Sequence, residues 1–480
     1  MKKSLGKNAF LNGFKNVLNL LFPLVTFPYV SRILSVEGIG QYNFSQATVS
    51  YFSLIAGLGI STYAIREGAK YREDKEKFNF FATEVLLCNI VSTIIAYILL
   101  VLCMLCVNKL KSYALLIWIF SIQIVFTTIG IEWVYSIYEE YEYITLRSII
   151  FKIVSIMLMF IFVRDSGDIA NYAAITVFSS AGSNVLNLVH SKEYFSVVKI
   201  RIRNCIKHIK PILVIFASNI AIMIYVYSDT TMLGFMQTDY EVGIYSVSVK
   251  IYNIVKNLLS SVLVVAIPRL SMYYGSGMIQ EFKTTAQKVY DSITTLLMPA
   301  VVGLFCVSRQ VVLVISDESY LPAEKSLRIL CVALVFCVYG WFFSQCILLP
   351  TQKEKMFLVA TCISAIANIS LNFCLIPVWQ EKAAAFTTFV AEFIMFLLCM
   401  VQGLKVVKIH LLNKNMLGIL SGCMAIVGVC RVTLWFNLGT IMQLLISILT
   451  SGIVYGLLLI IFHNEIIYAI LRKVFWTHEK

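Results

Sequence analysis

The chain alternates between long apolar runs and short polar breaks. Each run extends over roughly 18–25 residues, the length that a helix needs to cross about 30 Å of hydrocarbon. The apolar positions are continuous and do not alternate with a period of two, which favours helices over strands. We therefore predict about 14 membrane spans. They lie near residues 9–30, 43–64, 81–107, 113–134, 148–163, 169–189, 211–234, 243–268, 289–308, 327–349, 356–376, 383–402, 416–436 and 440–462.

Composition supports an all-α integral membrane protein. Of the 480 residues, 59% are hydrophobic and only 14% are charged, whereas a soluble domain carries about 25% charged residues. A bilayer offers backbone amides no water, so only helices or closed barrels can span it. The net charge of +13 is not accompanied by any nucleic-acid motif. We therefore assign the basic residues to the membrane surface and to an anionic ligand.

The distribution of basic residues predicts the topology. With the N-terminus in the cytoplasm, about 26 Lys and Arg fall in cytoplasmic segments and about 7 in outer segments, as the positive-inside rule requires. An even number of spans then places both termini in the cytoplasm. The basic, amphipathic segment 194–210 is expected to lie along the cytoplasmic surface as a linker helix.

The two halves of the sequence match at an offset of 203 residues. The matched pairs are Asn16 with Asn219, Gly40-x-Tyr42 with Gly243-x-Tyr245, and Arg66 with Arg269. Each repeat holds six spans, so both copies insert the same way up, and two parallel six-helix lobes result. The expected divisions are an N-lobe (1–193), a basic cytoplasmic linker (194–210), a C-lobe (211–402), and spans 13 and 14 with a cytoplasmic tail (403–480).

Polar side chains form stripes on several spans. Asn12, Lys15, Asn16 and Asn19 share one face of span 1. Asn faces also hold transmembrane helices together, and Lys15 lies close enough to the cytoplasmic end to snorkel, so packing remains an alternative for these residues.

Span 8 is harder to explain by packing. It carries Lys250 and Asn253 on one side, and Tyr245, Tyr252 and Lys256 on another. A lysine near mid-membrane costs roughly 2.5–3.5 kcal/mol on insertion scales. Two such lysines therefore indicate a hydrated cavity or a bound anion.

Intramembrane acids are candidates for ion coupling. Asp229 in span 7 pairs with a lysine, binds a cation or caps the outer end of its helix, and these three alternatives stay open. Glu392 in span 12 is a second candidate, and Asn368 in span 11 adds a polar group.

The sequence contains no constellation for covalent or metal catalysis. It has no zinc-protease, P-loop or nucleophile-elbow motif. The pair Cys103 and Cys106 has no histidine or second cysteine pair nearby, so we expect small buried hydrophobic residues here rather than a metal or redox site. We predict no cofactor and no enzyme activity.

Three stretches of the sequence form recognisable motifs. They are Phe27-Pro28-Tyr29-Val30-Ser31-Arg32-Ile33-Leu34 with Glu37-x-x-Gly40-x-Tyr42-x-Phe44, Asp229-x-x-Met232-Leu233-Gly234 with Glu241-Val242-Gly243-Ile244-Tyr245 and Lys250, and Asn368-x-x-x-Asn372 with Ile376-Pro377, Ala383-Ala384-Ala385 and Ala391-Glu392. In these stretches the chain resembles the oligosaccharide flippases of O-antigen or capsule repeat units. That family belongs to a superfamily which also contains multidrug and toxin extrusion transporters and the lipid II flippase. The chain departs from the third pattern at Gln380-Glu381-Lys382, where glycines are common.

The resemblance implies a V of two lobes in the bacterial cytoplasmic membrane, with spans 1, 2, 7 and 8 lining the cavity. The implied substrate is an undecaprenyl-diphosphate-linked oligosaccharide, moved by alternating access to the outer leaflet for surface polysaccharide synthesis. Membrane lipids, a polymerase and glycosyltransferases are the expected partners. The expected substrate-binding residues are Asn12, Lys15, Asn16, Asn19, Arg32, Arg66, Tyr245, Lys250, Asn253, Lys256, Arg269 and Asn368, and the expected ion-coupling residues are Asp229 and Glu392.

Two other functions remain in view. A multidrug or organic-cation antiporter of the same superfamily would be expected to use membrane-embedded carboxylates as its principal charges, whereas lysines match or outnumber carboxylates in these spans. A membrane scaffold that does not transport would leave Lys250 and Lys256 unexplained.

Overall fold

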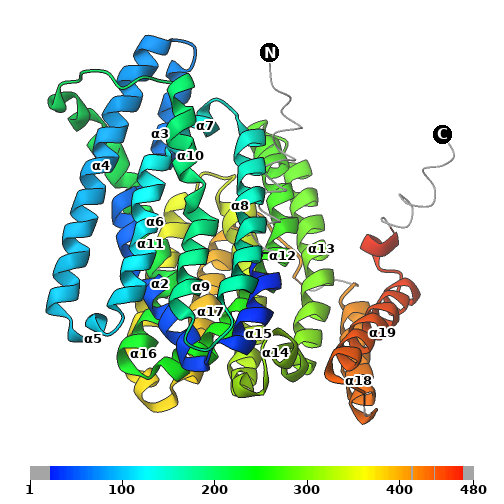
Figure 1. Cartoon of the computed structure of the whole chain (residues 1–480). Helices are drawn as coiled ribbons and strands as arrows, with labels where there is room; N and C mark the ends of the chain where they lie inside the picture. The colour runs from blue at the N-terminus through cyan, green and yellow to red at the C-terminus, as the bar shows by residue number, and fades with distance from the viewer. Residues whose placement is uncertain (1–21, 412–414, 437, 469–480) are drawn as a thin grey trace. The chain divides into compact units, whose positions relative to one another are not determined.

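Every regular element of the described chain is a helix. The computed structural model describes residues 22–411, 415–436 and 438–468 (Figure 1). Eleven helices in these ranges are long and apolar enough to cross a membrane. They correspond to the expected spans 2, 3, 5 and 7–14. The expected span 1 lies largely in residues 1–21, outside the described residues, and spans 4 and 6 are interrupted. The all-helical membrane class is confirmed, and the count of 14 stays a prediction.

The chain divides into two compact units, Met1–Gly243 and Ile244–Lys480. The helices of the first unit are α2 (Val36–Gly57), α3 (Ile60–Gly68), η1 (Ala69–Tyr71), α4 (Lys75–Cys106), α5 (Asn108–Lys111), α6 (Ala114–Gly130), α7 (Glu132–Ile137), α8 (Tyr141–Phe162), α9 (Ile169–Val177), η2 (Phe178–Gly182), α10 (Asn184–His190), η3 (Ser191–Glu193), η4 (Ile202–Cys205) and α11 (Ile206–Met236), preceded by a helical stretch at 22–33. The division at residue 193 between two lobes stays a prediction.

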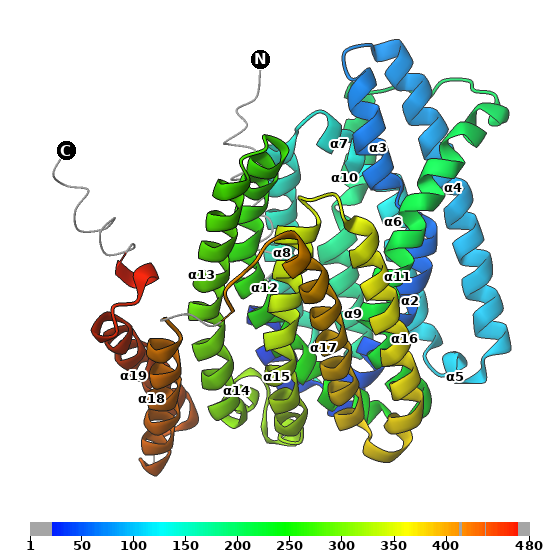
Figure 2. The same cartoon turned by 180° about the vertical axis from the view of Figure 1, so that it is seen from behind.

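The helix α12 (Asp239–Gly275) begins in the first unit and continues into the second. The remaining helices of the second unit are α13 (Ile279–Cys306), α14 (Ser308–Ile315), η5 (Glu318–Tyr320), α15 (Ala323–Trp341), η6 (Phe342–Leu348), α16 (Glu354–Trp379), α17 (Glu381–Val406), α18 (Asn415–Trp435) and α19 (Thr440–Ile461). The helices α15, α16 and α17 pack together, and the pair α18–α19 packs against α13 (Figure 2). The Tyr455 hydroxyl of α19 donates to the Thr295 carbonyl of α13 at 2.8 Å.

The second expected span is broken in the middle. Leu58 and Gly59 both adopt left-handed backbone conformations, with φ of 44° and 75°, and they separate α2 from α3. The break frees the Ala56 carbonyl, which accepts hydrogen bonds from Asn89 Nδ2 at 2.9 Å and Ser92 Oγ at 2.5 Å, both on α4. Side chains thus replace the missing helical bond, as a bilayer requires.

Two further spans of the first unit are irregular. Ile131 takes a φ of 36° between α6 and α7, a strained conformation for a β-branched residue. The Gly130 carbonyl before it accepts a hydrogen bond from Asn187 Nδ2 of α10 at 2.8 Å. The sixth expected span contains the π-helical turn η2. The segments α3, α7 and α10 lie at one end of the first unit, and α5 lies at the other (Figures 1 and 2).

The start of α2 and the start of α12 cross through a reciprocal glycine contact. A Cβ on Gly40 would overlap the Asp239 carbonyl oxygen, and a Cβ on Gly243 would overlap the Val36 carbonyl oxygen. Gly40 and Gly243, like Val36 and Asp239, are 203 residues apart. The offset found in the sequence therefore also relates the two sides of this crossing, where glycine permits the close approach of two backbones.

The structure corrects the expected linker helix. Residues 195–201 are not helical, and only the short turn η4 precedes α11. The segment runs across the end of α4 (Figure 1), where the Ser196 amide donates to Asn79 Oδ1 at 2.9 Å and the Val198 amide donates to Thr83 Oγ1 at 3.3 Å. These tertiary hydrogen bonds satisfy an extended backbone that β-branched residues favour.

The capping of the broken span can be tested by substitution. Changing both Asn89 and Ser92 to Ala leaves the buried Ala56 carbonyl without a donor, and we expect a loss of about 1–3 kcal/mol of stability. The measurement is thermal unfolding of the purified protein in detergent. Ser53→Ala is the control, because Ser53 only bonds the carbonyl of its own preceding turn, at Val49. Equal melting temperatures for the double variant and the control would contradict the capping role.

The glycine crossing predicts a matched pair of defects. Gly40→Ala and Gly243→Ala each force two backbones apart, and overpacking of this kind costs about 1–3 kcal/mol. Gly428→Ala on α18 should be tolerated, because no atom lies within 4 Å of a Cβ at that position. The same unfolding measurement checks the three variants, and wild-type stability of both crossing variants would exclude the contact.

Candidate functional site

A buried charged network lies in the first unit. Tyr63 OH is 2.6 Å from His208 Nδ1, and His208 Nε2 is 2.9 Å from Glu84 Oε2. Lys207 Nζ also reaches Glu84 Oε2, at 2.7 Å. Tyr63, Glu84 and His208 are all buried. The network ties α3, α4 and α11 together inside an apolar cluster around Phe78, and its donors and acceptors are matched, so we assign it a structural role.

A second polar cluster lies at the opposite end of α11. Asp239 accepts hydrogen bonds from Tyr113 OH at 2.6 Å and from Gln41 Nε2 at 3.1 Å. Lys109 Nζ donates to the carbonyls of Phe235 and Gln237, at 3.3 and 3.1 Å. These hydrogen bonds hold the turn between α11 and α12 in place. Because the Asp239 carboxylate and the Lys109 ammonium group both have partners in the protein, we assign this cluster a structural role.

The structure describes three more predicted site residues in the first unit. Arg32 is exposed, and Arg66 is exposed with Nε 3.3 Å from the carboxylate of its neighbour Glu67. Arg66 also interacts electrostatically with Tyr63 of the buried network. Asp229 of α11 is buried and interacts electrostatically with Tyr51 of α2, whose hydroxyl accepts a hydrogen bond from Thr231 at 3.2 Å. Arg66 and Asp229 thus contact different neighbours.

In the second unit, predicted residues of α12 meet α17. Tyr252 OH donates to Glu392 Oε1 at 3.1 Å, and Tyr245 OH lies 3.2 Å from Thr388 Oγ1. Lys256 Nζ stands 5.3 Å from the centre of the Tyr252 ring, in a cation–π arrangement, and interacts electrostatically with Glu392. The Tyr245–Tyr252–Lys256 face of α12 thus lies against its neighbours, and Lys256 and Glu392 share one environment.

The other predicted residues of the second unit are placed differently. Lys250 and Asn253 are partly buried on α12. Asn368 is fully inside and forms a ring of hydrogen bonds with Asn372 and Thr387: Asn372 Nδ2 donates to Asn368 Oδ1 at 3.1 Å, and Thr387 Oγ1 donates to Asn372 Oδ1 at 2.5 Å. This ring joins α16 to α17, which favours a packing role for Asn368.

A polar hollow forms between α12 and α13. It has a volume of about 260 Å³ and is lined by Val262, Arg269, Thr285, Lys288, Val289 and Ser292. Arg269 Nε donates to Tyr273 OH at 2.9 Å. In the part of the chain that the structure describes, no carboxylate lies within ion-pair distance of Arg269 or Lys288. Arg269 and Lys288 are both exposed, and two cations that share a hollow without an acid offer the charge that suits an anion.

Sequence reasoning identified Arg269 but missed Lys288. Arg269 lies on α12 and Lys288 on the next helix, α13. Only the packing of α12 against α13 brings the two side chains into one hollow. The expected residues Asn12, Lys15, Asn16 and Asn19 lie outside the described residues.

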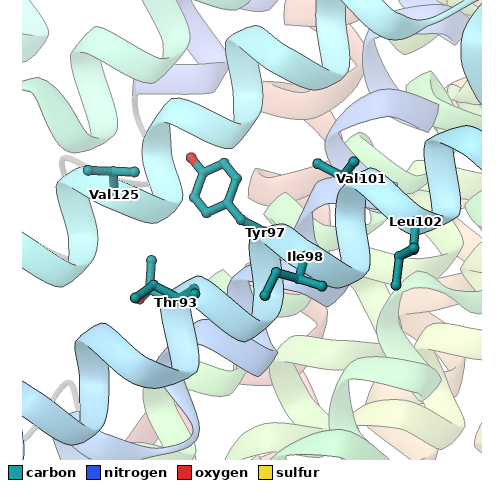
Figure 3. A pocket seen from close by; sticks show the side chains of 7 residues that line it. Thr93, Tyr97, Ile98, Val101, Leu102 and Val125 are labelled. Carbon is teal, nitrogen blue, oxygen red and sulfur yellow. The ribbon is translucent and has the colours of Figure 1, made fainter.

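The side of the first unit between α4 and α6 is hollowed but apolar. An open hollow of about 530 Å³ is lined by Thr93, Ile94, Tyr97, Ile98, Val101, Leu102 and Val125 (Figure 3). Tyr97 OH donates to the Ser121 carbonyl at 2.6 Å, and Thr93 Oγ1 lies 2.7 Å from Thr128 Oγ1. The polar atoms are therefore satisfied internally, and this surface suits hydrocarbon and not a sugar.

Among the described residues, no group of three His, Cys, Asp or Glu side chains is placed to hold a metal ion. The cysteines at 103 and 106 lie at the end of α4, but Cys103 is only half-buried and Cys106 is exposed, so the expectation of buried residues is wrong for Cys106.

Comparison with solved structures defines the class of fold. The lipid II flippase MurJ in an inward closed conformation matches with a TM-score of 0.77 over 96% of this chain and 99% of that one. An inward-facing multidrug resistance MATE family transporter of the MOP superfamily matches with a TM-score of 0.60 over 81% of this chain and 93% of that one. Sequence identity is 15% in both cases, so these matches establish a MurJ- and MATE-like fold.

Sequence comparison defines the family. A model of the polysaccharide biosynthesis protein family matches residues 5–274, more than half of the chain. The chain therefore belongs to the polysaccharide biosynthesis protein family, as its motifs indicated.

Two relatives carry the description "putative O-antigen transporter". The protein of Escherichia coli (strain K12) is 29% identical over 272 residues, 56% of this chain and 66% of its own length, which is just under two thirds. The protein of Shigella dysenteriae is 25% identical over 403 residues, 83% of this chain and all of its own length. The prediction that the chain is of a transporter type and is not an enzyme is confirmed by these comparisons.

The buried network makes a prediction about stability. Glu84→Ala leaves the buried His208 Nε2 without its hydrogen-bond partner, and an unsatisfied buried polar group costs about 1–3 kcal/mol. Glu73→Ala, an exposed acid just before α4, should change stability by less than about 0.5 kcal/mol. Thermal unfolding in detergent measures the stability of both variants. Equal melting temperatures for Glu84→Ala and Glu73→Ala would show that the network does not stabilise the fold.

Proposed function

We propose that this chain is a flippase that moves an undecaprenyl-diphosphate-linked oligosaccharide from the cytoplasmic to the outer leaflet, for O-antigen or capsule biosynthesis. Family membership and the names of the two relatives support the substrate class. The observation that carries the proposal is the pair Arg269 and Lys288 in one polar hollow, with no carboxylate within ion-pair distance among the described residues. A diphosphate offers the acceptor oxygens and the charge that such a pair binds.

The predicted topology places the hollow on the side from which the substrate would be taken up. Arg269 and Lys288 lie at the end of α12 and the beginning of α13, which the charge pattern assigns to the cytoplasmic side. The hollow would then take the diphosphate as it arrives from the cytoplasm. Arg66, its counterpart in the first repeat, is exposed and would meet the same headgroup at the mouth.

Residues nearer the middle of α12 would bind the headgroup of the substrate at the next stage of transport. Lys250 and Lys256 offer positive charge within the span, and Asn253 with Tyr245 offers groups that hydrogen-bond sugars. Together with Arg32 and the span 1 residues Asn12, Lys15, Asn16 and Asn19, they complete the proposed binding set. The lipid tail would stay in the bilayer, because only the headgroup is too polar to cross it unaided.

Alternating access would cycle the site between the two leaflets, with the two six-helix lobes as the moving bodies. Glu392 is the preferred candidate for coupling to an ion, because it lies beside Lys256 and Tyr252, so that its protonation would change the charge next to a substrate lysine. Asp229 is the second candidate. A polymerase and glycosyltransferases would supply and consume the substrate in the same bacterial cytoplasmic membrane, with both termini of the chain on the cytoplasmic face.

Multidrug antiport is the alternative function. The MATE-like fold is compatible with it, but that likeness concerns fold alone. The hollow of Arg269 and Lys288 would repel an organic cation, so its chemistry favours the anionic substrate.

The anion hollow can be tested by complementation. Arg269→Ala and Lys288→Ala should each lower surface polysaccharide about tenfold or more in a strain that lacks its own flippase. Loss of a charge-assisted hydrogen bond to phosphate costs about 1.5–3 kcal/mol. Lys283→Ala is the matched control, an exposed lysine on the same helix α13 that does not line the hollow. Normal polymer at normal protein levels in both hollow variants would remove the site from the mechanism.

The lysines within α12 give a separate test. Lys250→Ala and Lys256→Ala should abolish polymer export, and Lys→Arg changes at the same positions should retain part of it, because the positive charge is what the diphosphate requires. Drug-resistance assays in an efflux-deficient host discriminate the alternative. Resistance conferred by the wild-type chain, with unchanged polymer in the Ala variants, would support antiport instead.

A further inference from the structure

The basic segment after α10 adjoins a second, apolar groove. This groove has a volume of about 600 Å³ and is lined by Leu86, Ile90, Ile129, Ile131, Leu188, Ser191, Lys192, Phe195, Ser196 and Val197. Most of its lining is aliphatic or aromatic, and its polar members all belong to the segment 191–196. One end of the groove is therefore polar and cationic, and the remainder is apolar.

The groove and the hollow of Figure 3 follow one another along the same two helices. Leu86 and Ile90 of α4 line the groove, and Ile94 and Tyr97, further along α4, line the hollow. On α6, Ile129 lines the groove and Val125 lines the hollow. The step from Leu86 to Tyr97 covers about 16 Å at 1.5 Å per residue, close to half of the roughly 30 Å hydrocarbon core. We call this succession of two spaces along α4 and α6 the seam, and its length matches a single leaflet.

The cations at the polar end are not neutralised by the protein. Lys192, Lys199, Arg201, Arg203 and Lys210 are exposed, and none of them has a carboxylate within ion-pair distance among the described residues. The neighbouring Glu193 is directed to His190 instead, with Oε1 3.4 Å from Nδ1.

Apolar side chains alternate with these cations. Val197, Ile202 and Ile206 are 72%, 78% and 62% exposed. Leu188 and Ile90, which line the groove itself, are 46% and 41% exposed. A segment that exposes both aliphatic chains and unpaired cations fits an anionic lipid surface, where hydrocarbon and phosphate are both within reach.

We propose that the seam between α4 and α6 is a binding site for an anionic phospholipid of the leaflet on the basic side. The phosphate is bound by Lys192 with the hydroxyl of the exposed Ser196, and one acyl chain lies along Leu86, Ile90 and Ile129 toward Tyr97. The site is separate from the proposed substrate path, because none of the residues that line the groove or the hollow belongs to the proposed binding set.

The bound chain contacts a strained position. Ile131, with its left-handed backbone, lines the same groove. An acyl chain packed on Ile131 stabilises that conformation, since strain persists only where the surroundings hold it. Phospholipid binding is thus expected to raise the stability of the first unit as well as to occupy its surface.

Native mass spectrometry of the purified full-length protein tests the site. Phosphatidylglycerol is titrated into detergent micelles, with phosphatidylcholine as the zwitterionic comparison. We expect phosphatidylglycerol to be retained and Lys192→Ala to weaken its binding about fivefold, the factor that one basic residue contributes near an anionic surface. Lys283→Ala, an exposed lysine of the second unit, should bind as the wild type does.

A second pair of variants separates a built groove from general surface charge. Ile90→Trp and Leu188→Trp fill the groove and leave every cation in place, and both should weaken binding about tenfold. Ile153→Trp, on the exposed face of α8, is the matched control. Wild-type binding in both groove-filled variants would overturn the proposal, because attraction by charge alone would then explain retention.

Competition identifies the occupant. Undecaprenyl diphosphate added to the phosphatidylglycerol complex should leave the phospholipid bound. Displacement one for one would show that the seam is an entry path for the transported lipid and would refute a separate phospholipid site. Because these measurements record lipid retention and not polymer export, a failure here is distinguishable from a failure of the flippase assignment.

Discussion

Backbone hydrogen bonding without water is the constraint on which the first unit depends. Its second, fourth and sixth expected spans all depart from regular α-helix, and at the first two breaks a buried amide or hydroxyl from another helix supplies the missing donor. A bilayer would otherwise make each exposed carbonyl costly. The polar side chains of α4 and α10 are therefore part of the backbone architecture, and their presence in apolar runs does not by itself indicate a ligand.

The same distinction applies to charge. Glu84 binds both His208 and Lys207, and the resulting cluster is buried and internally matched. Arg269 and Lys288 share a hollow in which no acid faces them among the described residues, and the basic segment after α10 is likewise unneutralised. Carboxylates thus neutralise basic groups inside the scaffold, and the exposed basic surfaces proposed to bind anions have no acid within ion-pair distance among the described residues.

Much of this architecture was readable from the sequence. The length of the apolar runs predicted the spans. The offset of 203 residues matched Gly40 with Gly243, but it did not predict that their helices cross at these two residues. The break at Leu58 is flanked by Gly57 and Gly59, and these glycines indicate a possible interruption of the helix, although the apolar run continues through them.

The sequence around Ile131 does not indicate a break, because β-branched residues rarely adopt left-handed conformations. The amphipathic pattern of segment 194–210 predicts a helix. The extended backbone found there is held by hydrogen bonds to Asn79 and Thr83, and the periodicity of the sequence does not reveal such tertiary contacts. Lys288 and the Glu84–His208 pair were missed because their partners are distant in sequence or on another helix.

The crossing of α2 and α12 has a consequence for the origin of the chain. Residue i of one copy meets residue j of the other, and j meets i, which is the arrangement that identical subunits make about a two-fold axis. A half-length ancestor with this glycine would already have possessed a self-complementary contact, which is the geometric condition for pairing about a two-fold axis. After gene duplication joined the copies, each side was free to diverge except at this point, where a larger residue on either copy would separate both.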